Sequence, residues 1–249
     1  MRISASLACL FLGIAAVVSG CCSSEKTTEK DTPFEVLVYT RTQSFKHGSI
    51  PNGVAALEKM APANDFTVQQ TDDPAAFTDE NLKRFAVVVF MNTSGNVLDD
   101  TGKAALKKFV ESGGGFVGLH AATDTEFKWP WYGTLVGARF TNHPKIQPAS
   151  IKVVDAKHPA TTHLPNPWQL TEEWYNFKEL APDNHVLLNL DETSYKGGTN
   201  GANHPMAWTR IVGKGRVFYT GLGHRPEIFT DPDFVEHLRG GLLWTAGRM

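Results

Sequence analysis

Gly113-Gly-Gly-Phe-Val-Gly-Leu-His-Ala-Ala-Thr-Asp124 is the stretch with the clearest structural signature in this chain. Its three leading glycines end a helix that is predicted to begin near Asp99. Residues 116–119 then form a short apolar run, typical of a buried strand, that leads directly into His120. A buried strand that ends in a polar residue between small ones presents that side chain at a sharp turn. His120 is therefore a candidate reactive group, and the alternative is a structural histidine satisfied by a backbone carbonyl.

Strands and helices alternate on the amino-terminal side of this stretch. The apolar run 34–40 predicts a buried strand, and a helix is expected over 51–60. Further strands are predicted at 66–70 and 85–90. This rhythm is typical of an open, doubly wound α/β fold with a mostly parallel sheet, whose ligands bind beyond the carboxyl ends of the strands.

The pattern changes after about residue 145 to strands separated by turns. Strands are expected over 151–154 and 185–190. Residues 206–211 and 216–222 flank Gly213-Lys-Gly215 and predict a C-terminal β-hairpin. The apolar positions between 234 and 244 then fit a closing helix.

Polar residues follow several of the predicted strands. His47, Asn92, His120 and His224 come after the first, third, fourth and last of them. Because the ends of parallel strands meet at one edge, we expect His47, His120, Glu173 and His224 to converge there. His47, His120 and His224 are the candidate metal ligands, and zinc is the common ion that best suits nitrogen-rich ligation.

Residues 172–177 read Glu-Glu-Trp-Tyr-Asn-Phe and set two carboxylates beside three aromatic rings. Burial near rings raises the pKa of a carboxyl group, and the rings can stack on a sugar. Glu173 is the candidate acid/base group, with Trp174 and Tyr175 as sugar contacts, and only one of the two glutamates is expected to enter the site. The alternative is a solvated acidic turn whose aromatic rings pack in the core.

A few other residues are weaker candidates. Asp124 either orients His120 or caps the following helix. His143 and His204 each precede a proline, a pattern found in ordinary turns, but their polar and aromatic neighbours also suit a sugar site. Trp208 is a further candidate for stacking on a sugar.

The first 20 residues carry Arg2 and an apolar stretch too short to span a bilayer, which indicates an export signal. The signal ends Val18-Ser-Gly-Cys21, which resembles the lipobox of bacterial lipoproteins and predicts lipidation of Cys21. An ordinary secretory signal is the alternative. Residues 21–32 are polar and predict a disordered tether, followed by one domain over 33–249. We therefore expect an exported protein, anchored by its lipid to a bacterial cell-envelope membrane.

Charge and cysteine content narrow the possible partners and sites. The chain has 24 Lys and Arg against 26 Asp and Glu, and removal of the signal with Arg2 brings the net charge to about −3. Nothing in this balance suggests nucleic acid as a partner. After loss of Cys9 and lipidation of Cys21 only Cys22 remains, so any metal must rest on His, Asp and Glu.

Five stretches in order resemble the ThuA-like, trehalose-utilisation family over about residues 34–247. They are 36–40 with His47, 113–120, 173–177, 207–210 and 215–224. The resemblance implies a flavodoxin-like sheet like that of class I glutamine amidotransferases, in which a cysteine nucleophile stands at the turn after a central strand. His120 occupies that position here, so amidotransferase acyl-enzyme chemistry does not carry over.

The resemblance also implies a carbohydrate substrate. The family is associated with disaccharide use beside dehydrogenases that form 3-keto-glycosides, whose carbonyl acidifies the neighbouring C2 proton. An enzyme acting on disaccharides or 3-keto-glycosides would use His120 and Glu173 as acid/base groups, with His47 and His224 holding a metal or the sugar. The alternative is a non-catalytic sugar-binding lipoprotein in which Trp174, Tyr175 and Trp208 stack on the ligand. A scaffold with a decayed site would leave the polar cluster at the strand ends unexplained.

Overall fold

The structure is a computed structural model that describes residue 1 and residues 32–249. The predicted signal, the lipidation site at Cys21 and nearly all of the predicted tether lie outside the described residues. Within the described part of the chain, no helix is both long enough and apolar enough to cross a membrane.

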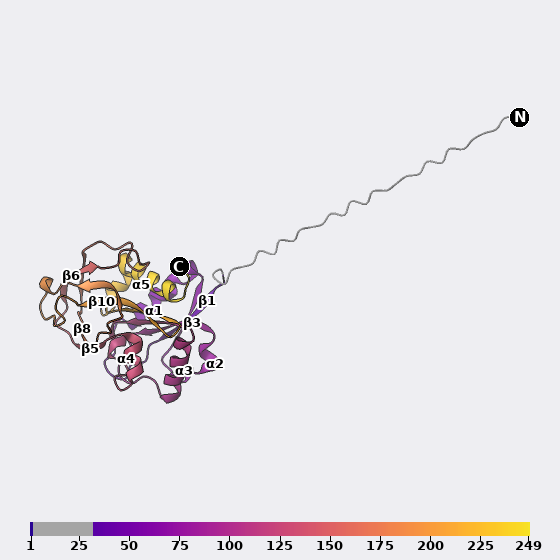
Figure 1. The fold of residues 1–249 in the computed structure, drawn as a ribbon, viewed down its shortest axis with the longest axis horizontal. Coiled ribbons are helices and arrows are strands. Elements are labelled where there is room, and N and C mark those ends of the chain that lie inside the picture. Colours follow the sequence, from indigo (N-terminus) through magenta and orange to yellow (C-terminus); the bar gives the residue numbers. More distant parts are fainter. Residues whose placement is uncertain (2–31) are drawn as a thin grey trace.

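A nine-stranded sheet forms the centre of the molecule, in the order β2-β1-β3-β4-β11-β10-β9-β6-β7 (Figure 1). The first five of these run parallel to one another: β2 (Phe66–Thr71), β1 (Phe34–Tyr39), β3 (Phe85–Met91), β4 (Gly115–Leu119) and β11 (Gly215–Thr220). Each of the other four is antiparallel to its neighbours: β10 (Pro205–Val212), β9 (His185–Leu190), β6 (Gln147–Val153) and β7 (Trp168–Glu172). A separate two-stranded sheet pairs β5 (Arg139–Asn142) with β8 (Asn176–Lys178).

Helices cover both faces of the sheet. The α-helices are α1 (Ile50–Met60), α2 (Asp79–Leu82), α3 (Asp100–Glu111), α4 (Pro130–Val136) and α5 (Pro232–Thr245). The 3₁₀ segments are η2 (Pro62–Asn64), η3 (Pro74–Ala76), η4 (His120–Asp124), η5 (Glu192–Ser194) and η6 (Pro226–Thr230). In Figure 1, α1 and α5 lie on one side of the sheet and α2, α3 and α4 on the other. Both α1 and α5 contact η6, and α2 contacts α3, in agreement with these two layers.

The strand order of the parallel half is that of a flavodoxin-like fold, as the sequence predicts. The central strands β1, β3 and β4 are almost fully buried, which explains their uninterrupted apolar sequences. The predicted hairpin is also confirmed, since β10 and β11 pair antiparallel around Gly213 and Lys214. The sequence did not predict β5, β7 or β8.

This topology brings four loops to one edge of the sheet. The strands β1, β3, β4 and β11 are consecutive neighbours, so the segments that leave their carboxyl ends lie together. The backbone turns sharply at two of these exits, where Asn92 has φ 51° and His120 has φ 40°. Non-glycine residues adopt such left-handed angles infrequently, and they persist where the surrounding structure holds them.

Candidate metal centre

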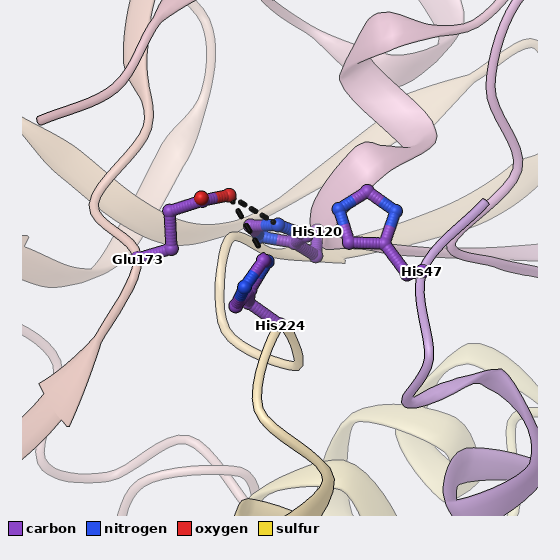
Figure 2. Close-up of side chains that lie close together, drawn as sticks. All are labelled: His47, His120, Glu173 and His224. Carbon is purple, nitrogen blue, oxygen red and sulfur yellow. Dashed lines mark ion pairs between the residues drawn. The ribbon is translucent and has the colours of Figure 1, made fainter. Parts of the chain in front are cut away.

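Four side chains meet at this edge: His47, His120, Glu173 and His224 (Figure 2). One ring nitrogen of each histidine and one carboxylate oxygen of Glu173 all lie within 4.8 Å of one another. The three histidines come from the exits of β1, β4 and β11, and Glu173 follows β7. The structure thus brings together the four residues whose convergence the sequence predicts.

The three imidazole rings form a compact, edge-to-face group. The ring centres of His47 and His120 are 4.9 Å apart, and His224 lies 5.2 Å from each of them. The ring plane of His47 is nearly perpendicular to the planes of His120, at 89°, and His224, at 88°. This arrangement points nitrogen atoms towards a shared centre instead of stacking the ring faces.

The tautomer of His120 follows from its hydrogen bond. Its Nδ1 lies 2.9 Å from the carbonyl oxygen of Gly221, so Nδ1–H donates and the neutral ring carries its lone pair on Nε2. That Nε2 lies 3.3 Å from Oε2 of Glu173. Two lone pairs at this distance repel each other, and a cation or a proton between them removes the repulsion. The Gly221 carbonyl is also the kind of partner that orients a metal-binding histidine.

Among the described residues, His47 Nδ1 is buried without a hydrogen-bond partner, whereas His120 Nε2 and His224 Nδ1 are buried and both face the single oxygen Oε2 of Glu173. A buried polar atom without a partner is costly, and three ring nitrogens gathered around one carboxylate suit a cation. Imidazole nitrogen and a carboxylate are ligands that zinc accepts, with bonds of about 2.0–2.2 Å. Four such ligand atoms within 4.8 Å of one another fit a divalent metal.

Electrostatics prepare the cluster for a cation. Burial raises the pKa of Glu173, but its contacts with His120 and His224 outweigh burial and hold the pKa below its usual range. Burial, followed by the neighbouring His120 and His224, lowers the pKa of His47 to about 3. At neutral pH the site therefore contains an ionised carboxylate and a neutral His47, and both are ready to bind metal.

The two oxygens of Glu173 face different surroundings. Oε2 lies 3.0 Å from Nδ1 of His224 and also faces His120, whereas Oε1 lies 3.0 Å from Nδ1 of His143. The His143 side chain is 42% exposed, so it links the buried carboxylate to solvent. Glu172 is fully buried and makes hydrogen bonds outside the cluster, so only Glu173 enters the site, as the sequence predicts.

Tyr175 is part of the wall of the centre. Its ring centre lies 3.9 Å from that of His120 on one side and 4.1 Å from that of Phe140 on the other. The ring is held between these two neighbours and is almost fully buried. Phe140 and Phe45, whose ring centre lies 4.8 Å from that of His47, are the site neighbours that the sequence reasoning missed. The position of Phe45, two residues before His47, was the available signal.

The remaining candidates are not brought to the cluster. Trp174 and Trp208 are fully buried and donate their indole N–H to the carbonyls of Gln147 and Val136. His204 is buried and bonds the Tyr175 carbonyl, which supports the wall of the site from behind. These positions favour supporting roles, and the sugar contacts expected of the three residues stay predictions.

Asp124 does not orient His120 as one of the two sequence hypotheses expects. The Gly221 carbonyl already takes the Nδ1–H of His120. The Asp124 backbone carbonyl accepts from Gly95, and burial raises the pKa of the Asp124 carboxyl group. Asp124 does not cap α4 either, because the N-cap position of that helix belongs to Trp129.

Comparison with known proteins identifies the family. The family described as "Trehalose utilisation", ThuA, matches residues 35–245. A ThuA-like protein from Bacteroides uniformis is 27% identical, with a TM-score of 0.73 over 86% of this chain and 92% of that one. A ThuA-like protein from Parabacteroides merdae is 19% identical, with a TM-score of 0.70 over 86% of this chain and 90% of that one.

More distant structures share the fold alone. A cytoplasmic protein from Salmonella typhimurium is 11% identical, with a TM-score of 0.61 over 85% of this chain and 98% of that one. No curated protein matches the sequence. The family match covers nearly all of the folded residues, and the chain therefore belongs to the ThuA, trehalose-utilisation, family.

Proposed function

We propose that the protein is a carbohydrate-processing enzyme in which His47, His120 and His224 hold a divalent metal, preferably zinc, and Glu173 is the general base. One observation carries the proposal: three buried imidazole nitrogens converge beside one ionised carboxylate, and His47 Nδ1 has no hydrogen-bond partner among the described residues. When bound, such an ion supplies a Lewis acid that polarises a carbonyl oxygen. The chain's own residues supply the proton chemistry.

The substrate class that suits these groups is a 3-keto-glycoside. The C2–H bond next to a carbonyl is acidic enough for a carboxylate base, whereas the same bond in the parent sugar is not. Glu173 would accept the C2 proton at Oε1, and the electron pair of the broken bond would move onto the carbonyl oxygen. Return of that pair to C2 either takes up a proton and restores the C2–H bond, or forms a C1–C2 double bond and breaks the C1–O bond, with the glycosidic oxygen leaving as it takes up a proton. The description of the family as trehalose utilisation supports a disaccharide substrate.

His143 contacts the proposed general base on its solvent side. Its Nδ1 contacts Oε1 of Glu173, and its side chain reaches solvent. That Nδ1 also lies 3.0 Å from the Pro144 carbonyl oxygen, so it carries a hydrogen, and the His143 N–H holds Oε1 in place and favours its ionised form. His120 does not act as the general acid in this arrangement, because its Nδ1–H donates to the Gly221 carbonyl and its Nε2 faces the metal centre.

Elemental analysis of the purified protein tests the metal. After dialysis without chelator we expect about one divalent ion per chain, lost in His47→Ala and His120→Ala variants. His185→Ala is the control, because that residue is exposed and paired with Asp155 at the far end of β9. A wild-type metal content near zero would remove the metal and leave direct acid/base catalysis.

Solvent deuterium exchange at C2 tests the reaction. We expect exchange with 3-keto-trehalose and none with trehalose, because only the first has an acidified C2 proton. NMR reports this step even when the glycosidic bond survives. If the wild type neither exchanges C2 nor cleaves the keto sugar, yet binds trehalose tightly, the non-catalytic sugar-binding protein replaces the enzyme.

A further inference from the structure

The segment Gly221–Arg225 leaves β11 and carries His224. Its backbone and the side chains around it connect every loop that supplies a candidate ligand. Four side chains from the loops around the centre bond this backbone: His120, Ser49, Asn92 and Glu172. One of them is a ligand itself, and the others belong to or bind the segments of His47 and Glu173.

Asn92 joins the loop of His47 to the loop of His224. Its side chain is fully buried, and Nδ2 donates to Ser49 Oγ and to the Gly223 carbonyl, both at 2.9 Å. Ser49 Oγ donates to the same carbonyl at 2.8 Å. Ser49 lies two residues after His47, and Gly223 directly precedes His224. The left-handed backbone of Asn92, at φ 51°, aims the amide at this junction.

Glu172 joins the strand of Glu173 to the other end of the same segment. Its carboxylate is fully buried and accepts two backbone N–H groups, from Glu173 at 2.9 Å and from Arg225 at 3.1 Å. Glu173 is the proposed general base, and Arg225 directly follows the candidate ligand His224. The carboxylate therefore ties the backbone of Glu173 to that of Arg225, the residue after His224.

We propose that Gly221–Arg225 is the element that assembles the metal centre, with Asn92 and Glu172 as positioning residues that set the ligand geometry. This inference rests on the metal site proposed above. Because His120, the His47 loop and the Glu173 strand are all bonded to one five-residue segment, displacement of that segment moves several ligands together. Loss of either positioning residue should therefore weaken and distort metal binding without removing a ligand.

The variants Asn92→Asp and Glu172→Gln keep the side-chain shape and remove specific bonds. Asp at position 92 loses both donated hydrogen bonds, and Gln at position 172 keeps only one of its two acceptors. Asn184→Asp is the matched control: the Asn184 amide donates to the Gly137 carbonyl at 2.9 Å, beside Arg210 at the opposite edge of the sheet. If Asn92→Asp does not fold, Ser49→Ala is tested in its place, because it removes one hydrogen-bond donor to the same Gly223 carbonyl.

Competition between the protein and a chelator for Zn²⁺ measures the affinity. We expect about a 10- to 100-fold loss in the two positioning variants, the usual effect of losing an outer partner, and a change of less than about twofold in the control. The visible absorption of Co²⁺-loaded protein reports geometry, and we expect its intensity and position to change in the same variants. If wild type binds Zn²⁺ and both variants bind it equally well with an unchanged Co²⁺ spectrum, the inference is wrong.

Hydrogen exchange of the metal-free protein gives a second, independent readout. Glu172→Gln should accelerate exchange at the Glu173 or the Arg225 amide, whichever loses its acceptor, and Asn92→Asp should accelerate it over the amides of 221–225. The amides of Val97 and Leu98, held by Glu126, serve as a reference that should not change. A wild type without affinity for Zn²⁺ contradicts the proposed metal site, whereas unchanged exchange in both variants contradicts this inference.

Discussion

The Glu173 carboxylate touches both the histidine cluster and the exposed His143. Glu173→Gln keeps the size of the side chain and removes its basicity. Loss of a general base typically lowers a rate by about 10²–10⁴-fold, so we expect C2 exchange with 3-keto-trehalose to fall by that factor. Glu58→Gln, on the exposed face of α1, is the control and should exchange at the wild-type rate. Wild-type exchange in Glu173→Gln would place the base elsewhere.

Phe45 is the exposed aromatic ring beside the centre. It is 62% exposed although its ring touches His47, and its carbonyl is fixed by Ser94 Oγ at 2.6 Å. Such a ring can stack on a sugar. We expect Phe45→Ala to raise the KM of the keto sugar about two- to tenfold, which corresponds to a ring contact of about 0.5–1.5 kcal/mol, with unchanged metal content.

A second exposed phenylalanine provides the control for Phe45. Phe127 is 43% exposed and lies under Arg139 and Lys178, away from the histidines. Phe127→Ala should leave the KM unchanged. Equal effects of the two substitutions, or none from Phe45→Ala, would exclude a sugar contact at Phe45.

The sequence predicts which histidines meet, but not how they are held. His47, His120 and His224 each follow an apolar strand, and parallel strands end at the same edge, so their meeting needs no coordinates. The Gly221 carbonyl that fixes the tautomer of His120 is a backbone atom with no residue-type signal. It becomes a partner only because β4 and β11 are neighbours.

Among the elements, long apolar strands were predictable and short ones were not. The strands β1 and β3 are buried on both faces and have continuous apolar sequences. In contrast, β8 has three residues and β5 has four, and β7 alternates irregularly between buried and exposed positions. Such segments are stabilised by their partners more than by their own composition, so the ribbon β5–β8 beside the centre had no clear signal.

The close packing of helix α5 on the rest of the molecule predicts how a glycine substitution in it changes stability. Gly→Ala inside a helix gains about 1 kcal/mol of helix propensity. At Gly240, however, a Cβ atom would lie 2.3 Å from the Pro159 carbonyl oxygen, a backbone atom that cannot rotate away. Overpacking costs about 1–3 kcal/mol. We therefore expect Gly240→Ala to lower the free energy of unfolding, measured by urea denaturation.

Gly102→Ala in α3 is the matched helix control. A Cβ there would lie 3.2 Å from side-chain carbons of Leu98 and Phe77, which can shift slightly. The gain in propensity should then leave stability equal or higher. If both substitutions shift the urea midpoint alike, the contact with Pro159 does not decide the outcome.

At the scale of the whole molecule, the candidate centre joins the two halves of the sheet. The three histidines leave strands of the parallel half, whereas Glu173 follows β7, the last strand of the antiparallel half. The polypeptide returns from that far edge through residues 173–175 to reach His120. Sequence reasoning placed Glu173 in the site by its aromatic neighbours and by family resemblance, because no strand order can be read from a pattern of residues.

A histidine beneath the sheet predicts how global stability depends on pH. His237 on α5 is fully buried, donates from Nδ1 to the Ala160 carbonyl at 2.7 Å and accepts at Nε2 from Thr220 at 3.2 Å. Burial lowers its pKa to about 4, against 6.5 for an ordinary histidine. His158 is also buried, and burial lowers its pKa to about 4 as well.

Between pH 6.5 and pH 4 the unfolded chain therefore binds protons that the folded chain excludes, and stability must fall as the pH falls through this window. His237 alone accounts for a loss of about 3 kcal/mol across it, from the pKa difference. Urea unfolding of metal-free protein at constant ionic strength, from pH 4 to pH 7.5, measures the slope. His237→Asn should be less stable at pH 7.5 but should lose less stability on acidification, and adding His158→Asn should flatten the curve further. A His237→Asn curve parallel to that of the wild type would show that His237 takes up its proton within the folded protein.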